Sequence, residues 1–407
     1  MAAKIVVTGM GAVTPLGIGV ENYWDALLRG ECGIGEIDAA QERKMLISRA
    51  AQVKNFNPRD YLNVRLAADL DLFMQYAYVA AEQALADSGM DARSWRTGVV
   101  MGTALAGLEF AGQTQQALAQ SGKPVSPRFL SKYMGNIAAA QFAIDHGIKG
   151  PSMTVGTACS SGGDAIVLAS MLLRTGDADS VVVMAGESPI SPLVINGLCK
   201  AGALSKTGES RPFDAGRNGF VVGEGGGALV LETERHATRR GARIHAVLGG
   251  CANNTDAYHT VTPEPAGAGA AVCMGLALSR AELEPKDIGY LNAHGTATAA
   301  GDVAETHAIH RVFRQYEVPV SSTKGATGHL MGAGGITEAI ACIKAIQTGI
   351  LPFNTGFEQP DRECDLNIIA EKPLERNISW AMSNSLGFGG QNSCVIFGRY
   401  DGPGTER

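Results

Sequence analysis

Two distant segments of this chain follow the same pattern: a short apolar strand, a bend rich in small residues, and then a helix. In the first, M-T-V-G-T (153–157) precedes a Gly/Ser-rich bend and a helix ending in L-R-T-G-D (173–177). In the second, V-P-V-S-S-T (318–323) precedes a Gly-rich bend and a helix ending in I-Q-T-G-I (346–350). Such an internal echo indicates two similar units packed together. We therefore expect two similar halves that meet near residue 240, residues 1–240 and residues 241–407.

Short apolar segments alternate with longer helical patterns, which is typical of an α/β fold. No Pro/Ser-rich linker or low-complexity stretch divides the chain. The segments expected to be buried strands are residues 99–102, 152–155, 180–185 and 228–231. The segments expected to be helices are residues 22–29, 71–88 and 163–175.

The composition argues against several classes of protein. A formal net charge of −6, with no long run of Lys and Arg, disfavours nucleic-acid binding. No apolar run has the length of a signal peptide or a membrane span. The 8 cysteines are scattered without a C-x-x-C pair, which suits reduced thiols better than disulfides or a zinc site. We expect a cytoplasmic protein that binds neither nucleic acid nor membrane.

Cys159 lies in G-T-A-C-S-S-G-G-D, between a predicted strand and a predicted helix. Free backbone N–H groups and the helix dipole favour a thiolate at the first turn of a helix. The small residues around it would let a substrate approach closely. The alternative is a small buried residue that packs at the start of the helix. Cys159 is thus a candidate nucleophile or a packing residue.

His294 follows an apolar strand in N-A-H-G-T-A-T (292–298). A histidine at the end of a strand can donate to an oxygen, and Thr296 and Thr298 could bind a polar substrate arm. The same pattern is compatible with a loop histidine whose hydrogen bonds are satisfied locally.

His329 lies in T-K-G-A-T-G-H (323–329), among residues that are mostly small. Lys324 before it and Glu338 after it could form a buried charge pair that orients the site. A loop histidine beside a close-packed helix start is the alternative. We expect no metal site, because Cys159 and the two histidines lack the short spacing of metal ligands.

The segment G-F-G-G (387–390) predicts a tight turn. Such a turn fixes a backbone N–H that can form half of an oxyanion hole, and it places the Phe388 ring beside it. A hairpin-like turn with a core phenylalanine is the alternative. G-M-G-A-V-T (9–14) follows a strand but lacks the third glycine and the acidic residue of a dinucleotide loop, which disfavours a nucleotide-binding oxidoreductase.

Taken together and in this order, these motifs closely resemble those of the β-ketoacyl-[acyl-carrier-protein] synthases, nearest to the elongating synthase II type. The resemblance covers nearly the whole chain, from V-V-T-G-M-G-A-V-T-P-L-G (6–17) through R-P-F-D-A-G-R-N-G-F-V-V-G-E-G (211–225) and D-A-Y-H (256–259). It implies the thiolase fold, with two pseudo-symmetric halves in a five-layer αβαβα arrangement, usually as a dimer. The first half would carry Cys159, and the second His294 and His329.

The resemblance implies an acyltransferase. Cys159 would take an acyl group from acyl carrier protein, with the N–H groups of Cys159 and Phe388 holding the oxyanion. Malonyl-carrier would then lose carbon dioxide, and His294 and His329 would stabilise the enolate that attacks the acyl group, giving a 3-oxoacyl product. No cofactor is implied, because the substrates are carried on phosphopantetheine.

The resemblance assigns expected roles to further residues. Lys324 and Glu338 would order the site electrostatically, Thr296 and Thr298 would contact the phosphopantetheine arm, and Phe388 would also act as a gate between the acyl pocket and the malonyl site. The expected substrate-binding positions are completed by Leu105, which would limit acyl-chain length, and by Gly387 and Gly389.

The chain departs from the family in the segment that docks the acidic carrier. Elongating members often have a basic stretch there, whereas this chain has N-V-R-L-A-A-D-L-D (63–71), with Arg65 as its one positive residue. We expect docking to use Arg65, Arg128, Lys132 and Lys206, or a partner subunit. Val261 also replaces a usual hydroxyl, which puts one pantetheine hydrogen bond in doubt.

Alternatives to fatty-acid elongation follow from the same residues. A polyketide or polyene ketosynthase would share the chemistry and could pair with a homologous chain-length subunit in place of a homodimer. The altered docking stretch motivates this hypothesis. A thiolase needs a second cysteine as base, but G-F-G-G is followed by Gln391, and Cys394 lies in the next strand. A silent structural subunit would lack the nucleophile Cys159.

Overall fold

A computed structural model of the chain describes residues 3–38, 40–122 and 124–402. Its centre is an 11-stranded mixed sheet in which two groups of five strands meet at β1 and β9, and the eleventh strand, β2 (Gly17–Ile18), pairs with β1. The strands of the first group are β1 (Ile5–Thr14), β5 (Thr97–Gly102), β6 (Ser152–Val155), β7 (Ser180–Glu187) and β8 (Gly225–Thr233). The strands of the second are β9 (Ala246–Thr255), β10 (Ile288–Asn292), β11 (Val320–Ser321), β14 (Trp380–Gly387) and β15 (Gln391–Gly398).

The two groups have the same strand order and the same strand directions. Across the first the order is β6-β5-β7-β8-β1, and across the second it is β11-β10-β14-β15-β9. In each group three neighbouring strands are parallel and the last two pairings are antiparallel. Within each strand group the parallel strands end at the same edge, where the loops that follow them can build a site.

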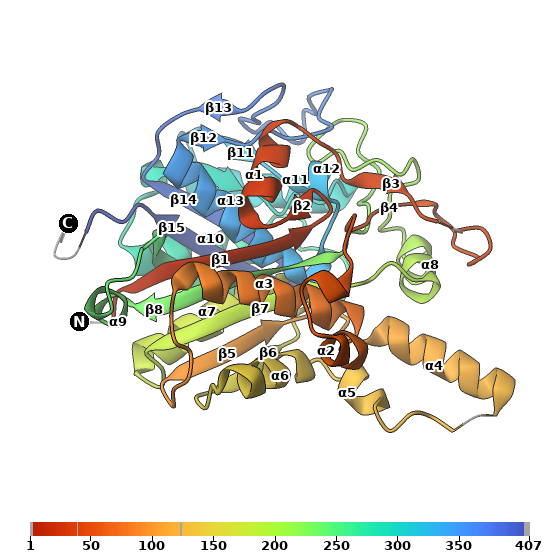
Figure 1. Ribbon diagram of the computed structural model, residues 1–407. Helices are drawn as coiled ribbons and strands as arrows, with labels where there is room; N and C mark the ends of the chain where they lie inside the picture. Colours follow the sequence, from red (N-terminus) through yellow and green to blue (C-terminus); the bar gives the residue numbers. More distant parts are fainter. Residues whose placement is uncertain (1–2, 39, 123, 403–407) are drawn as a thin grey trace.

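Helices cover the two groups and fill the space between them, so that the chain forms five layers (Figure 1). On the outer face of the first group lie α3 (Leu72–Ser88) and α6 (Ile137–His146), and on that of the second lies α10 (Ala268–Ala281), with α11 (Ala299–Phe313) packed against it. The middle layer consists of α7 (Ser161–Thr175) and α13 (Gly334–Thr348). This architecture confirms the expected αβαβα thiolase fold.

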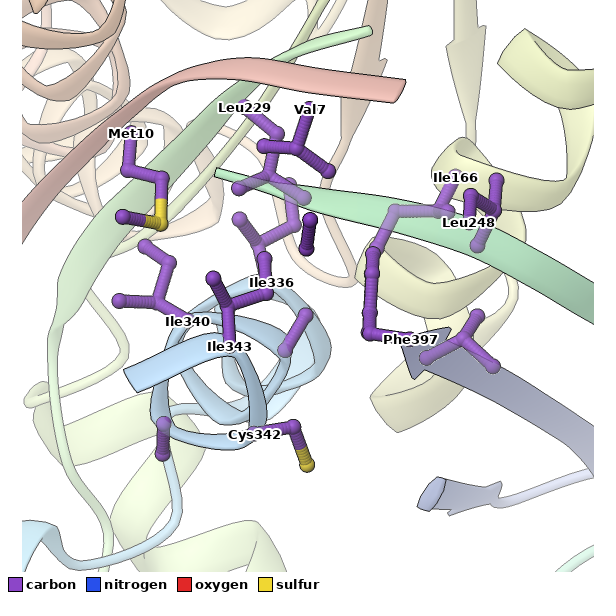
Figure 2. Close-up of a cluster of buried hydrophobic side chains, with 14 of the residues drawn as sticks. Val7, Met10, Ile166, Leu229, Leu248, Ile336, Ile340, Cys342, Ile343 and Phe397 are labelled. Atoms are coloured by element: carbon purple, nitrogen blue, oxygen red, sulfur yellow. The ribbon is translucent and has the colours of Figure 1, made fainter. Parts of the chain in front are cut away.

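The middle-layer helix α13 is buried along most of its length. In α13, thirteen residues are buried, from Gly334 to Ile346. Figure 2 shows Ile336, Ile340 and Ile343 of α13 pointing toward the strands that carry Val7 and Leu229, with Cys342 on the opposite side of the helix. A helix with apolar residues all around its axis is stable only when it is covered on all sides, here by both sheets.

Glycines allow α7 and α13 to approach each other closely. A Cβ atom on Gly162 would lie 2.7 Å from the carbonyl oxygen of Gly332, and one on Gly335 would lie 2.6 Å from the backbone nitrogen of Gly163. Real Cβ atoms do not come this close to backbone atoms, so the contact requires glycine. The residues that follow the nucleophile and those that follow His329 thus meet backbone to backbone.

The remaining helices and short strands complete the loops. Outside the five layers lie the helices α1 (Val20–Leu28), α2 (Val64–Asp69), α4 (Leu108–Ser121), α5 (Phe129–Tyr133), α8 (Pro192–Lys200), α9 (Glu234–Arg239) and α12 (Lys324–Thr327). Short strands are β2 (Gly17–Ile18), β3 (Ile34–Glu36), β4 (Arg49–Ala51), β12 (Ile350–Leu351) and β13 (Leu374–Glu375). None of the helices in the described ranges has the length and apolar character needed to cross a membrane.

The expected elements are all present, with longer bounds for several. The segments expected as strands are β5, β6, β7 and β8, and those expected as helices are α1, α3 and α7. The G-M-G-A-V-T segment is the interior of β1 rather than a phosphate-binding loop. Its glycines serve packing, because a Cβ on Gly9 or Gly11 would lie 2.0 Å from a backbone carbonyl oxygen of α3.

Candidate active site

Cys159 lies in a 3₁₀ turn (Ala158–Ser160) that joins β6 to α7. Its side chain is almost completely buried, at 6% exposure. Ala158 takes a left-handed backbone conformation, with φ of 50°, which turns the chain sharply between strand and helix. The nucleophile candidate is therefore placed at the start of the middle-layer helix, as the sequence predicts.

Burial gives the Cys159 thiol properties that the sequence does not predict. Desolvation raises its pKa to about 12, although the Lys324 ammonium and the backbone N–H groups of Phe388 and Cys159 act in the opposite direction. The backbone N–H groups favour the thiolate, as the sequence predicts, but in the free chain the loss of hydration outweighs them. The Cys159 thiol must therefore lose its proton when it attacks a substrate.

His294 and His329 lie side by side, although 35 positions separate them in the sequence. Their ring centroids are 5.3 Å apart, and the ring planes are nearly perpendicular, at 84°. His294 follows the end of β10, and His329 follows α12, where its backbone N–H donates to Val221 (2.7 Å). Both loops come from the second strand group, opposite Cys159.

Both imidazoles are neutral near pH 7. Burial, followed by the nearby Lys324 charge, holds the pKa of His294 and that of His329 well below the usual range. A neutral imidazole offers one N–H donor and one acceptor nitrogen. Neither ring nitrogen of His329 has a hydrogen-bond partner among the described protein atoms, so this ring can donate to a substrate oxygen.

Lys324 and Glu338 form the predicted buried ion pair. Lys324 is 1% exposed and Glu338 2% exposed, and the ammonium donates to Glu338 Oε1. Burial raises the pKa of Glu338, and the lysine charge opposes this increase. The lysine charge reaches both histidines and Cys159, so one buried cation influences all three candidate catalytic groups.

Glu305 and Asp302 hold the His294 loop, and sequence reasoning missed both. The Glu305 carboxylate accepts hydrogen bonds from the backbone N–H groups of His294 (2.8 Å) and Gly295 (2.7 Å). Asp302 accepts from the N–H groups of Phe213 (2.7 Å) and Ala297 (3.1 Å). The available signal was two acidic residues, i and i+3, in an otherwise mostly apolar helix start directly after the histidine motif.

The G-F-G-G turn joins β14 to β15 and packs against the Cys159 segment. A Cβ on Gly387 would lie 2.8 Å from the carbonyl oxygen of Thr157 and 3.2 Å from the Cys159 nitrogen, so glycine is required there. The backbone N–H of Phe388 faces the Cys159 sulfur. Two backbone N–H groups, those of Phe388 and Cys159, thus converge on the same sulfur, as in an oxyanion hole.

Cys159, His294 and His329 line a single pocket. The pocket encloses about 740 Å³ between protein atoms, including its open mouth. Thr296 and Thr298 line it and hydrogen-bond to each other through their hydroxyls at 3.0 Å. Other residues that line the pocket include Gly295, Asp302, Glu305, Val261, Asp256, Gly387, Phe388, Gly390 and Asn392.

Two predicted substrate positions lie outside this lining. Gly390 rather than Gly389 faces the pocket, and the Gly389 N–H donates to the carbonyl of Thr260 at 2.8 Å. Leu105 lies in the loop after β5, where it packs with Phe388 against an apolar cluster that includes Ile195 and Met331. Leu105 is therefore close to the site through this shared cluster, although it does not line the pocket.

A pair on the pocket rim, Asp256 and Asn392, was also missed. Asn392 Nδ2 donates to Asp256 Oδ1 at 2.7 Å, and the Asp256 N–H donates to the Gly390 carbonyl at 2.7 Å. These bonds tie the D-A-Y-H segment to the G-F-G-G turn. The sequence contains both motifs but no signal that they are adjacent.

The expected docking residues lie on separate segments of the chain. Arg65 and Arg128 meet at Asp69, with distances of 3.6 and 2.8 Å to its carboxylate oxygens. Lys132 lies on α5, the helix that Arg128 precedes. Lys206 belongs instead to the loop after α8, where its N–H donates to an asparagine side chain at 3.0 Å. Part of the positive charge near α2 and α5 is therefore neutralised within the chain.

No group of three or more His, Cys, Asp and Glu side chains within the described residues is arranged to hold a metal ion. The chemistry available at this site is that of one thiol, two neutral imidazoles, a buried ion pair and converging backbone N–H groups. Such a set suits transfer of an acyl group to sulfur and stabilisation of negative charge on oxygen.

Comparison with known proteins agrees with this set of groups. The profile described as "Beta-ketoacyl synthase, N-terminal domain" matches residues 2–237, and "Beta-ketoacyl synthase, C-terminal domain" matches residues 245–358. The chain is 39% identical to 3-oxoacyl-[acyl-carrier-protein] synthase 2 of Staphylococcus aureus (strain COL), over 98% of this chain and 99% of that protein. It is 37% identical to the enzyme of the same name from Vibrio harveyi, over 97% and 98%.

Solved structures extend the comparison to a second group of proteins. The ishigamide ketosynthase/chain length factor aligns with a TM-score of 0.92 and 29% identity, over 98% of this chain and 100% of that one. A type II PKS ketosynthase in complex with its acyl-carrier protein aligns with a TM-score of 0.90, 29% identity and the same coverage. A β-ketoacyl synthase from Burkholderia phymatum STM815 aligns with a TM-score of 0.91 and 31% identity, again with that coverage.

Proposed function

The chain belongs to the β-ketoacyl synthase family, and on this premise we propose that it condenses an acyl group held on Cys159 with a malonyl unit carried by acyl carrier protein. The product would be a 3-oxoacyl-carrier. The observation that carries the proposal is the shared pocket, where Cys159 from one strand group faces His294 and His329 from the other.

Acyl loading is the first proposed step. The Cys159 sulfur attacks the thioester carbonyl of the acyl-carrier, and the N–H groups of Phe388 and Cys159 stabilise the oxyanion. When the tetrahedral intermediate collapses, the bond to the carrier sulfur breaks. The proton that leaves Cys159 is then taken up by the departing carrier thiolate.

Decarboxylation supplies the carbon nucleophile in the second step. Malonyl-carrier loses carbon dioxide, and the electron pair of the broken bond forms an enolate. The enolate oxygen accepts hydrogen bonds from the ring N–H groups of His294 and His329. The α-carbon then attacks the acyl carbonyl on Cys159, the carbon–sulfur bond breaks, and the departing Cys159 thiolate takes up a proton from solvent. No strong base is required, which agrees with the low pKa of both imidazoles.

The other residues of the site support these steps in the proposal. Lys324 and Glu338 order the site electrostatically, and Thr296 and Thr298 receive the phosphopantetheine arm, so that no further cofactor takes part. Phe388 acts as the gate, Gly387 and Gly389 allow its turn to approach the substrate, and Leu105 limits the acyl chain. Arg65, Arg128, Lys132 and Lys206 receive the carrier.

A second candidate is the ketosynthase of a polyketide or polyene pathway. The structural alignment with the ishigamide ketosynthase/chain length factor supports it, as does the partly neutralised docking region. This chain would then pair with a homologous chain-length subunit, whereas a fatty-acid synthase would pair with a second copy of itself.

The strand groups also support a division of the chain near residue 240. The eight free cysteines fit a cytosolic location.

Intact mass spectrometry after incubation with a panel of acyl-carriers tests the proposal. We expect a mass increase equal to one acyl group in the wild type and none in Cys159→Ala, which should keep its circular dichroism spectrum. Addition of malonyl-carrier should release a 3-oxoacyl-carrier. Condensation by Cys159→Ala would refute the assignment, and turnover restricted to saturated chains would exclude the polyene alternative.

A further inference from the structure

Glu187 is a fully buried carboxylate that the proposed reaction does not use. It is the last residue of β7 and is 0% exposed. Burial raises the pKa of Glu187 to about 7, while hydrogen bonds from its neighbours favour its charged form. A buried carboxylate is costly unless several donors surround it, so its partners indicate what it holds in place.

The partners of Glu187 come from two separate segments. From the loop after β5, its Oε1 accepts hydrogen bonds from the Thr103 hydroxyl (3.1 Å) and the Ala104 N–H. The N–H groups of Leu105, from the same loop, and of Gly332 also stabilise the carboxylate. Gly332 lies in the 3₁₀ turn (Met331–Ala333) that follows His329.

Gly332 leaves no space beside this carboxylate. A Cβ atom there would lie 2.6 Å from Glu187 Oε1 and 2.7 Å from the Ala104 nitrogen. The Glu187 carboxylate therefore lies between the loop that carries Leu105 and the turn that follows His329, and it contacts both. Without the carboxylate, the Thr103 hydroxyl and the Ala104 N–H would lose their partner, and the Gly332 N–H would lose a favourable negative charge beside it.

We propose that Glu187 is a positioning residue, whose carboxylate fixes the loop carrying Leu105 to the turn that follows His329. Leu105, which limits the acyl chain, and His329, which stabilises the enolate, are then held at a fixed position relative to each other. This inference rests on the proposed function, because it assumes the roles of Leu105 and His329 in the condensation.

Glu187 also acts on Cys159 through its charge. The negative carboxylate raises the pKa of the Cys159 thiol, in addition to the larger effect of burial. Removal of the charge should therefore make Cys159 more reactive toward iodoacetamide at a fixed pH below the thiol pKa. This effect can be measured without any acyl substrate, and a purely structural role would not produce it.

The test compares Glu187→Gln with the matched control Glu224→Gln. Glu224, just before β8, is another buried carboxylate with a pKa raised to about 7, but it accepts from Tyr76 (3.1 Å) and Val53 (3.1 Å) rather than from the Leu105 loop. For each variant, kcat/KM is measured with acyl-carriers of increasing length, and Cys159 alkylation by iodoacetamide is followed from pH 7 to 10.

In Glu187→Gln we expect the discrimination between the best acyl chain and the next longer one to fall at least about threefold. We also expect alkylation at pH 8 to be at least about threefold faster, which corresponds to about half a pKa unit. Glu224→Gln should change neither quantity. Equal behaviour of the two variants overturns the inference.

Failure of the proposed function gives a different result. If the wild type neither takes an acyl group on Cys159 nor condenses it, the proposed function fails; if the wild type condenses and Glu187→Gln keeps its selectivity and alkylation rate, only the inference about Glu187 fails. Should Glu187→Gln not fold, Thr103→Val removes one donor to the carboxylate, with Thr103→Ser as its control. Unchanged chain-length discrimination in Thr103→Val then overturns the inference.

Discussion

The buried pair of Lys324 and Glu338 gives the most quantitative prediction, through the substitution Lys324→Met. Methionine fills a similar volume without the charge, so Glu338 would remain buried without its cation. At exposures of 1% and 2%, neither side chain can be rehydrated in place. Breaking a buried pair by removal of one partner typically costs about 3–5 kcal/mol of stability.

The protonation state of Glu338 refines this magnitude. Burial already raises the pKa of Glu338, and the lysine charge is what opposes the increase, so Glu338 in Lys324→Met should become protonated near pH 7. Protonation limits the loss to the lower end, about 3 kcal/mol. The double variant Lys324→Met/Glu338→Leu replaces the whole pair by apolar groups and should return to within about 1–2 kcal/mol of the wild type.

Urea denaturation followed by circular dichroism measures the stability of the wild type, both single variants and the double variant. Alkylation of Cys159 gives an independent readout, which should be slower in Lys324→Met because Lys324 lowers the pKa of that thiol. The reasoning is refuted if Lys324→Met loses less than about 1 kcal/mol, or if the double variant is less stable than either single variant.

Three further predictions concern the catalytic groups and the middle layer. His294→Ala and His329→Ala should slow carbon dioxide release from malonyl-carrier more than acyl loading, measured by radiolabelled release and intact mass; the opposite order would reassign both residues. Because the Cys159 pKa is raised to about 12, its alkylation rate should rise about tenfold per pH unit from pH 7 to 9; a plateau near pH 8 would contradict the effect of burial. Gly162→Ala should destabilise the fold by roughly 2–4 kcal/mol, because the new Cβ would lie 2.7 Å from a backbone oxygen. Gly275→Ala, in open space on α10, should instead stabilise the fold by about 0.5–1 kcal/mol. Equal thermal midpoints for the two glycine variants would show that the close approach is not required.

Each motif combines a strand end with small residues and a reactive side chain, but each one taken alone is also compatible with a packing or loop residue. The order of the motifs along the chain, through the family resemblance, predicted that Cys159, His294 and His329 share one site, and the three residues line one pocket. The ion pair of Lys324 and Glu338 could also be predicted, since both residues flank the same histidine in the sequence.

What could not be predicted depends on residues that are far apart along the chain. Glu187 meets Gly332 across 145 positions, and no local pattern in either segment records the contact. The raised pKa of Cys159 could not be predicted for the same reason. The helix start is a local feature that favours the thiolate, whereas the desolvation that outweighs it follows from burial in the folded chain.

The close backbone approach of α7 and α13 has a consequence for how such enzymes can be recombined. Each of these two helices begins just after a reactive residue, and each presents glycines to the other where a methyl group would not fit. A chimaera that joins one half of this chain to the complementary half of a relative would therefore be active only if the small residues match at this seam. Exchange of the outer helices, by comparison, would leave the relative positions of Cys159, His294 and His329 unchanged.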